Sequence, residues 1–396
     1  MFLGPQRDVL YCEGPGNIVA AFEAWRAGTG VMSETSVTFS SQIFDACRAE
    51  RVSLYAVSSG AQHAMAHDAA FTVVNMPRWQ IGIPKIGYDL SVLLYAFRVA
   101  LLALRVRPQV ILVGGGIEPA FCEILRISGA RIVPLLHNTL WPEGFPTLGL
   151  KARIVRSAER RFFSRIAVAT MAVSPAVARQ ARSLGAKHVT EFRPSFPSES
   201  FSQDCASVDF NQRPFQIVFA GRIERNKGVF DILDMAERLG QGFSFTICGG
   251  GSDLERLGQS SKERGLGNVT ICGRLNRPAL IERYLAAHAV VVPTRSNFAE
   301  GYAMVAAEAV LLLRPVITSP VVPASEVLAP AVALARTDDV DSYIQAINRL
   351  ANDKEYYAEL VKGARRLRSV VLDGSSSLLA VTREALRSLA CGKSTC

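Results

Sequence analysis

Apolar and polar positions alternate along the first half of the chain in a pattern that predicts strands separated by helices. Short apolar runs are separated by segments in which apolar residues recur at helical spacing; the runs are DVLYC, VSLYAV, FTVVN, QVILVGG and RIVPLLHN. Such alternation favours a mainly parallel, wound sheet. Ser174 and Pro175 have the residue types of a helix N-cap and first helical position, and Gly185 stands where that helix is expected to end.

The most apolar stretch, 87–107, predicts one long helix. Its large apolar residues recur at helical spacing, at Leu90, Leu93, Leu94, Phe97, Leu101 and Leu104. Asp89 and Arg98 interrupt the apolar runs, which fall short of the roughly 20 residues that a membrane-spanning helix needs. We therefore expect a buried helix that packs on the sheet.

A change of composition separates the two halves of the chain. Residues 191–214 are rich in Pro, Ser, Asp, Gln and Asn and show no periodicity, whereas apolar runs resume beyond them with FQIVFAG, FSFTICGGG, NVTICG, AVVVPT and RPVITS. The pattern predicts two Rossmann-like, wound parallel-sheet α/β domains that face each other across a cleft, at 1–195 and 215–372, with a linker at 196–214. A last helical segment, 373–396, can pack on either domain.

Length, composition and charge narrow the class of protein. The chain has 396 residues, of which 49% are hydrophobic and 20% charged, enough for two globular cores. Its 8 cysteines lack the paired spacing of a zinc site, and the N-terminal residues lack the pattern of a secretion signal. We therefore expect a cytoplasmic protein with reduced thiols and no metal.

Basic residues are densest in the segment 151–165, where they are interleaved with apolar residues; they are Lys151, Arg153, Arg156, Arg160, Arg161 and Arg165. A solvated helix face explains this pattern, and so does peripheral contact with the anionic inner face of a membrane. The net charge of +9 suits either reading. Nucleic acid is not an expected partner, because no nucleic-acid-binding module surrounds the segment.

Three turns of the second half carry glycine between a strand and a helix, which leaves backbone N–H groups and helix N-termini available for phosphate. They are AGRIERNKG at 220–228, CGGGSD at 248–253 and FAEGYAMVAAE at 298–308. In the first turn, Gly221 allows close backbone approach, and Arg222 and Lys227 supply two cations for a diphosphate. The alternative is that both are ordinary surface charges.

The second turn contains Gly249, Gly250 and Gly251, which is a common feature of strand-to-helix turns. A dinucleotide fingerprint requires G-x-G-x-x-G, but position 254 is leucine, and the glycines at 114–116 also lack that continuation. A nicotinamide-dependent oxidoreductase is therefore disfavoured.

The third turn places two acids in apolar surroundings, where carboxylates need partners. Glu300 precedes the predicted helix and Glu308 lies about two turns along it. Both are hydrogen-bond acceptors that suit sugar hydroxyls and a ribose. The structural alternative makes Glu300 a helix cap and Glu308 a member of an ion pair.

The order and spacing of these residues over about 215–319 resemble the family 4 retaining glycosyltransferases. The matching positions are Gly221-Arg222, Lys227-Gly228, Gly249 to Gly251, Gly273, Pro293, Glu300 to Glu308 and Pro315-Val316-Ile317. The resemblance implies the GT-B fold, a nucleotide-sugar co-substrate held mainly by the C-terminal domain, transfer with retention of configuration, and no cofactor.

The resemblance also implies roles for individual residues. Those matching Arg222 and Lys227 bind the donor diphosphate, the acid matching Glu300 contacts the donor sugar, and the acid matching Glu308 holds the ribose. Gly301 and Tyr302 are further donor-binding candidates. His137, at the end of a late strand of the first half, fits the position of a family histidine near the donor sugar; a strand-end histidine bonded to the backbone is the alternative.

The chain departs from the family where an acceptor-side Gly-Gly loop is usual and Glu13-Gly14-Pro15-Gly16-Asn17 stands instead. Gly14, Gly16 and Asn17 are the acceptor-side candidates. The acceptor is unidentified, with a lipid-linked glycan in surface polysaccharide or glycolipid assembly as a hypothesis. Two rival functions stay open, a sugar-nucleotide epimerase of the same fold and a catalytically idle scaffold that binds a membrane.

Overall fold

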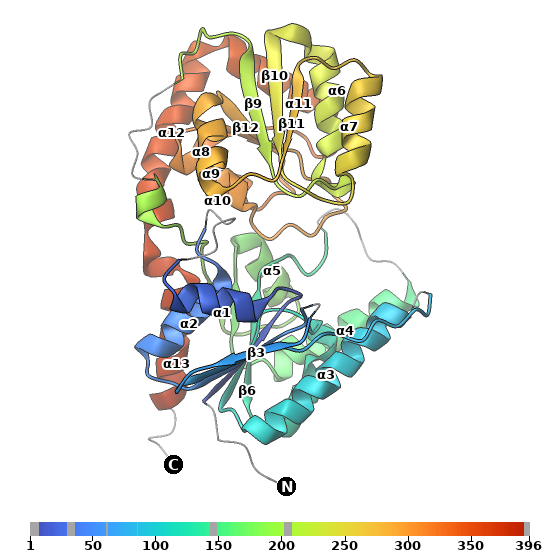
Figure 1. Ribbon diagram of the computed structural model, residues 1–396, viewed down its shortest axis with the longest axis vertical. Helices are drawn as coiled ribbons and strands as arrows, with labels where there is room; N and C mark the ends of the chain where they lie inside the picture. The colour runs from blue at the N-terminus through green and yellow to red at the C-terminus, as the bar shows by residue number, and fades with distance from the viewer. Residues whose placement is uncertain are drawn as a thin grey trace.

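The computed structural model describes residues 8–29, 36–60, 62–84, 86–142, 149–201 and 208–391. Two parts, each built on its own sheet, lie one above the other, with the N-terminal part at the bottom of Figure 1 and the C-terminal part at the top. Both have helices on the faces of their sheets, as the alternating pattern predicts.

The N-terminal sheet has eight strands in the order β3-β4-β2-β1-β5-β6-β7-β8. Their bounds are β1 Val9–Glu13, β2 Leu54–Ser58, β3 Ala64–His67, β4 Phe71–Asn75, β5 Val110–Val113, β6 Arg131–Leu136, β7 Thr170–Ala172 and β8 Val189–Glu191. The prediction of a mainly parallel sheet is confirmed, and the exception is at one edge, where β3 pairs with β4 antiparallel. The Asp68 carboxylate accepts hydrogen bonds from the backbone N–H groups of Ala70 and Phe71 and thereby stabilises this turn.

Three of the six helical elements described in this part begin at a capping side chain. They are α1 Ile18–Arg26, α2 Phe39–Ala49, α3 Gly87–Val106, η1 Pro119–Ser128, α4 Leu150–Arg165 and α5 Pro175–Ser183. Side chains of Asn17, Thr38 and Ser174 cap α1, α2 and α5. The predicted α5 start at Ser174-Pro175 is confirmed, and Gly185 has a positive φ just beyond the end of this helix.

The helix α3 is long, as predicted, but the apolar face expected to pack on the sheet is instead exposed. Leu90, Phe97, Leu101 and Leu104 are exposed, and Leu93 and Leu94 are half-buried. The buried face is made of smaller residues, namely Gly87, Ser91, Val92, Tyr95, Ala96, Val99, Ala100, Ala103 and Val106. The prediction is wrong because α3 has apolar residues on two faces, and periodicity alone does not tell which face meets the sheet.

The C-terminal sheet has six strands in the order β11-β10-β9-β12-β13-β14, all paired in parallel. The strands are β9 Phe215–Ala220, β10 Phe243–Cys248, β11 Val269–Gly273, β12 Ala289–Val292, β13 Val316–Thr318 and β14 Val332–Leu334. The helical elements around them are η3 Arg225–Lys227, α6 Val229–Leu239, η4 Gly240–Gly242, α7 Leu254–Glu263, α8 Arg277–Ala286, α9 Met304–Leu311, α10 Ala324–Val327, η5 Ala329–Ala331, α11 Val340–Asn352 and α12 Lys354–Leu372.

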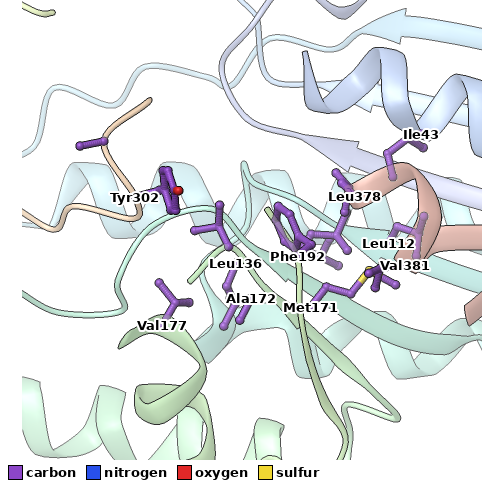
Figure 2. Packing of buried hydrophobic residues seen from close by; sticks show 14 of the residues in the cluster. Ile43, Leu112, Leu136, Met171, Ala172, Val177, Phe192, Tyr302, Leu378 and Val381 are labelled. Carbon is purple, nitrogen blue, oxygen red and sulfur yellow. The ribbon is translucent and has the colours of Figure 1, made fainter. Parts of the chain in front are cut away.

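The last helix, α13 Leu378–Cys391, follows η6 Gly374–Ser376 and lies against α2 of the N-terminal part. Figure 2 shows its Leu378 and Val381 beside Phe192 and Met171 in a buried cluster. Arg383 Nε and Arg387 Nη2 each lie within 2.8 Å of Glu50 Oε1. The chain therefore returns from the C-terminal part to the N-terminal part.

The segment predicted as a linker lies between β8 and β9, and its described residues include the short helix η2 Ser198–Phe201. Its exact limits, like the predicted domain bounds, stay predictions. A buried apolar cluster extends through both parts, and Ser174 Oγ donates a hydrogen bond of 2.8 Å to the carbonyl oxygen of Gly301. Within the described residues, none of the helices is both long enough and apolar enough to cross a bilayer.

Candidate functional site

Two glycine turns of the C-terminal part interlock at the carboxyl ends of β9 and β10. A Cβ on Gly249 would lie 1.8 Å from the carbonyl oxygen of Gly221, and one on Gly251 would lie 2.3 Å from that of Ile223. The Gly221 N–H donates to Cys248 O at 3.0 Å, and the Gly249 N–H donates to Gly273 O at 2.8 Å. Glycine at 249 and 251 is therefore required for close packing of the turns, and two of the amides expected to face a phosphate are already bonded to backbone.

A hollow of about 360 Å³ lies beside these turns, and we call it the C-terminal pocket. It brings together Gly221 and the four predicted charged residues of the C-terminal part, with further lining from β12, α9 and the N-terminal part; the lining includes Gly221, Arg222, Lys227, Thr294, Phe298, Glu300, Ala303, Met304, Glu308 and Asn138. Folds with wound parallel sheets bind ligands at the carboxyl ends of their strands.

A largely buried ion pair in the pocket joins Lys227 to Glu300. Lys227 Nζ lies 2.5 Å from Glu300 Oε2, and Thr294 Oγ1 donates to the same oxygen at 3.2 Å. The ammonium also lies 4.0 Å from the centre of the Phe298 ring. The neighbouring Gly228 has φ +73° and packs closely on the backbone of Pro293, where a Cβ would lie 2.1 Å from the carbonyl oxygen. This close packing places Lys227 beside the loop that follows Pro293 and contains Glu300.

The suggestion that Glu300 caps a helix is wrong. The helix α9 begins at Met304, and its N-cap residue is Ala303, which has φ +70°. Ala303 lines the pocket, and a left-handed conformation for a residue other than glycine costs roughly 1 kcal/mol. Strain of this kind is commonly found at ligand sites.

Arg222 is the more exposed of the two predicted cations, with 58% of its side chain accessible against 15% for Lys227. One guanidinium nitrogen lies 3.1 Å from Glu224 Oε1, and the group lies 5.2 Å from the centre of the Phe298 ring. Of the five N–H groups that a guanidinium carries, most stay available for a ligand.

Glu308 lies in the second half of α9 and is almost fully buried while still lining the pocket. Its Oε2 accepts a hydrogen bond of 2.7 Å from Tyr284 OH of α8. Burial raises the pKa of Tyr284, and the neighbouring Glu308 carboxylate raises it further, so the phenol stays a proton donor. Tyr284 therefore fixes one carboxylate oxygen of Glu308.

His137 lies in a second hollow of about 470 Å³, which we call the N-terminal pocket. Its ring stacks on Phe39 with 4.1 Å between ring centres, and burial lowers its pKa to about 4. Neither ring nitrogen has a hydrogen-bond partner among the described residues. The alternative of a histidine bonded to backbone is therefore wrong. Unpartnered buried nitrogens are costly and are a feature of sites that receive a ligand.

The two pockets meet at Asn138, which lines both, whereas His137 lines only the N-terminal one. Gly301 packs directly on the backbone at this junction, where a Cβ would lie 1.8 Å from the His137 carbonyl oxygen. The two domains thus touch at the residues between the pockets.

The acceptor-side candidates are divided between two hollows. Gly14 lines the N-terminal pocket, and Gly16 and Asn17 line a neighbouring hollow of about 400 Å³ that also contains Met304. The Asn17 side chain accepts hydrogen bonds from the Ala20 N–H and, at 2.8 Å, from Asn75 Nδ2. Its observed role is structural.

Three of the remaining candidates do not line either pocket. Gly250 and Gly273 lie at the ends of β10 and β11, and Gly273 takes part in the backbone bond described above. Tyr302 is buried, and Figure 2 shows its ring beside Leu136, so its side chain belongs to the apolar contact between the two parts. Their predicted contacts with a donor stay predictions.

Several pocket residues were missed by the sequence predictions. Asn138 and Thr294 line the C-terminal pocket only because loops and helices meet there, and Tyr284 supports Glu308 from behind it; none belongs to a motif. Gly114, Gly115 and Gly116 line the N-terminal pocket, and their position after an apolar run was a usable signal. The described residues contain no group of three or more His, Cys, Asp or Glu side chains suited to a metal ion.

Comparisons with known proteins agree with this geometry. Residues 201–367, less than half of the chain, match the family model described as glycosyl transferases group 1. A comparison with curated proteins finds no match.

Solved structures resemble the chain over nearly its whole length. Sucrose-phosphate synthase from Thermosynechococcus elongatus has a TM-score of 0.70 at 15% identity and covers 98% of this chain and 100% of its own. Trehalose 6-phosphate synthase from Burkholderia multivorans has a TM-score of 0.71 at 15% identity, with the same coverage. HepE from Anabaena in complex with UDP has a TM-score of 0.62 at 15% identity and covers 97% of this chain and 100% of its own.

At these identities the solved structures show the fold alone, and that fold is GT-B, with a mixed N-terminal sheet and a parallel C-terminal sheet. The matched domain contains the C-terminal pocket and its acids and cations. Together, the matched domain and the two-domain fold support a glycosyltransferase.

Proposed function

We propose that the chain moves a sugar from a nucleoside diphosphate sugar to an acceptor hydroxyl, with retention of anomeric configuration and without a metal. The observation that carries the proposal is the C-terminal pocket, where two cations and two buried carboxylates converge beside a glycine turn. Cations suit a diphosphate and carboxylates suit hydroxyl groups, so one pocket serves both ends of such a donor.

Lys227 and Arg222 are the proposed diphosphate ligands. An ammonium has three N–H donors, so Lys227 can keep its bond to Glu300 while it donates to a phosphate oxygen. Arg222 can swing from Glu224 to the diphosphate because its side chain is exposed and bonded on one side only. The two cations would also offset the charge that develops on the leaving diphosphate.

Glu300 and Glu308 are the proposed ligands of the sugar and the ribose. Lys227 and Thr294 hold one oxygen of Glu300, and Tyr284 holds one oxygen of Glu308. Each carboxylate is thereby oriented before a ligand binds. HepE, which shares the fold, is described in complex with UDP and with UDP-glucose, so uridine diphosphate sugars are the first donors to test.

Retention is proposed through substitution on one face of the sugar. The bond between the anomeric carbon and the diphosphate oxygen breaks, the acceptor oxygen bonds to the same carbon from the same side, and the acceptor proton passes to the leaving diphosphate. This sequence needs no pair of catalytic carboxylates. Neutral His137 would contact a donor or acceptor hydroxyl at the junction of the pockets, and the acceptor would enter through the N-terminal pocket.

The acceptor is proposed to be a glycan or glycolipid, as in assembly of a surface polysaccharide. An epimerase of the same fold would convert the donor with no acceptor present, and an idle scaffold would bind a donor without converting it. A transferase that uses water in place of its acceptor releases free sugar, and this release distinguishes it from both alternatives.

The test is an NMR time course of the anomeric signals, with donor incubated with the purified protein. Slow release of a free sugar that first appears in the donor's own anomeric configuration, together with UDP or another nucleoside diphosphate, supports a retaining transferase that uses water as a substitute acceptor. A free sugar of the opposite configuration would overturn retention, and a new nucleotide sugar would favour the epimerase.

A further inference from the structure

The exposed face of α3 carries a continuous apolar stripe. Leu90, Phe97, Leu101 and Leu104 are 36%, 48%, 57% and 43% exposed, and their spacing puts them on one side of the helix. The opposite side is packed, so α3 is already stabilised by its contact with the sheet. At 20 residues the helix is about 30 Å long, and the stripe runs along most of it.

Further large apolar side chains are exposed near this stripe. Trp79, Ile83, Ile86 and Tyr88 are exposed just before or at the start of α3, and Leu150 and Ile154 are exposed on α4. The helices α3 and α4 both pack against η1, and Lys151 of α4 pairs with Asp89 of α3 at 2.5 Å. We call the exposed side of these two helices the α3–α4 face. So many clustered exposed apolar residues are unusual for a surface that faces only water.

Arginines surround this apolar surface without acidic partners. Arg105 and Arg107 at the end of α3, and Arg153, Arg160 and Arg165 on α4, are exposed and have no carboxylate within ion-pair distance among the described residues. Elsewhere on the same face, Lys151 and Arg161 are paired with Asp89 and Glu123. The face therefore has an excess of positive charge.

We infer that the α3–α4 face binds the surface of an anionic lipid bilayer, with the helices lying in the plane of the interface. The apolar stripe would enter the boundary between headgroups and acyl chains, and the arginines would contact lipid phosphates. Arginine stems can lie along apolar surface while their charged ends reach the headgroups. None of the described helices needs to cross the bilayer.

The charges favour a bilayer over a second copy of the chain as the occupant. Pairing two copies through this stripe would bring the unpaired arginines of both chains together, and like charges that face each other across an interface are unfavourable. An anionic bilayer neutralises the same arginines.

The start of α3 lies at the N-terminal pocket. Tyr88, at the start of α3, lines that pocket, and its hydroxyl donates a hydrogen bond of 3.2 Å to Glu118 Oε1 of the pocket wall. Docking through α3 would therefore hold the pocket next to the lipid headgroups. If the proposed function holds, the acceptor is an amphiphile whose polar end enters the pocket while its apolar part stays in the bilayer.

The experiment is co-sedimentation of the full chain with vesicles of phosphatidylglycerol and phosphatidylethanolamine, and with vesicles of phosphatidylcholine alone. We expect binding to the anionic vesicles that weakens with salt. Neutralising Arg105, Arg153 and Arg160 to Gln should lower the affinity about fivefold per charge. Phe97→Ser with Leu101→Ser should abolish binding, whereas the controls Leu334→Ser and Arg366→Gln, which change exposed residues of the C-terminal part, should have no effect.

Equal binding of the arginine variant and the unchanged protein, or no binding by the unchanged protein, would overturn the inference. A lipid-free dimer that the Phe97 and Leu101 substitutions dissociate would identify a second copy as the occupant instead. Thermal stabilisation by donor, measured on the same variants, should be unchanged, because none of these residues lines the C-terminal pocket. The two proposals can therefore be tested separately. Donor binding can be absent while vesicle binding is present, or present while vesicle binding is absent.

Discussion

Lys227 and Glu300 form a 2.5 Å ion pair that joins the turn after β9 to the loop after β12, inside the pocket proposed to hold the donor. Both side chains are largely buried, at 15% and 9% exposed. Substitution of either residue should therefore change both the free energy of unfolding and donor binding. Single and double substitutions separate these two effects.

Lys227→Ala should lower the free energy of unfolding by about 2 kcal/mol, because it leaves a buried carboxylate without its cation. The double variant Lys227→Met with Glu300→Gln should recover most of this loss, since it removes both charges. Neither variant should bind donor well, with affinity lowered at least about tenfold. Chemical denaturation and donor titration measure the two quantities. Normal donor binding by the double variant would show that neither residue contributes to the donor site.

Tyr284→Phe should weaken donor binding several-fold, because it removes the 2.7 Å hydrogen bond that orients Oε2 of Glu308. The matched control is Tyr357→Phe, which removes a buried hydrogen bond of 3.1 Å to His288 O away from the pocket. Both changes should cost about 1 kcal/mol of stability. Only the first should change the donor KM, and equal donor kinetics for both would argue against a ribose role for Glu308.

Gly301→Ala should disrupt the junction of the two pockets, because the new methyl group would meet the His137 carbonyl oxygen at 1.8 Å. We expect a loss of about 2 kcal/mol in stability and a large loss of turnover. Gly267→Ala is the comparison, since a Cβ there meets nothing within 4 Å. Thermal unfolding and turnover of both variants test this, and a normal Gly301→Ala protein would show that the contact is not maintained in solution.

His137 should make stability depend on pH in a defined window. Burial lowers its folded-state pKa to about 4, whereas an unfolded histidine titrates near pH 6.5, so the unfolded state binds more protons between these values. The free energy of unfolding should therefore fall as the pH falls from about 6.5 to about 4. His137→Asn should remove up to about 3 kcal/mol of this dependence.

His288 contributes in the same direction, because burial also lowers its pKa, so the effect of His137 is the difference between the variant and the unchanged protein. Urea denaturation at several pH values provides that difference. Identical pH profiles for the two proteins would mean that His137 is not a buried neutral imidazole.

Metal independence is a separate expectation. Donor cleavage should be unchanged after dialysis against EDTA, because Arg222 and Lys227 supply the positive charge that a metal would otherwise bring to the diphosphate. Loss of activity in EDTA that Mg²⁺ or Mn²⁺ restores would contradict this part of the proposal.

Much of the fold was predictable because the chain alternates apolar runs and helical patterns in both halves, and the acids and cations of the third and first turns do meet in one pocket. The antiparallel β3 was not predictable, because AMAH is short and only weakly apolar. The orientation of α3 was not predictable either, since its small buried residues and its large exposed ones are both at helical spacing.

Contacts between distant elements account for the rest. Tyr284 and Thr294 hold the two acids only because α8 and β12 fold beside α9 and its preceding loop. Tyr302 was expected near the donor from its place beside Gly301, but its ring turns into the apolar contact between the domains. Sequence spacing located the turns, while side-chain direction depended on tertiary packing.

The central claim is that the C-terminal pocket binds a nucleotide sugar, and isothermal titration calorimetry tests it most directly. The unchanged protein, Lys227→Ala, Glu308→Ala and the surface control Lys187→Ala would each be titrated with UDP-, GDP-, ADP- and CMP-linked sugars. The account predicts that one nucleotide class binds the unchanged protein and the control alike, and binds both pocket variants at least about tenfold more weakly. Equal affinity in all four proteins, or no binding of any donor, would contradict it.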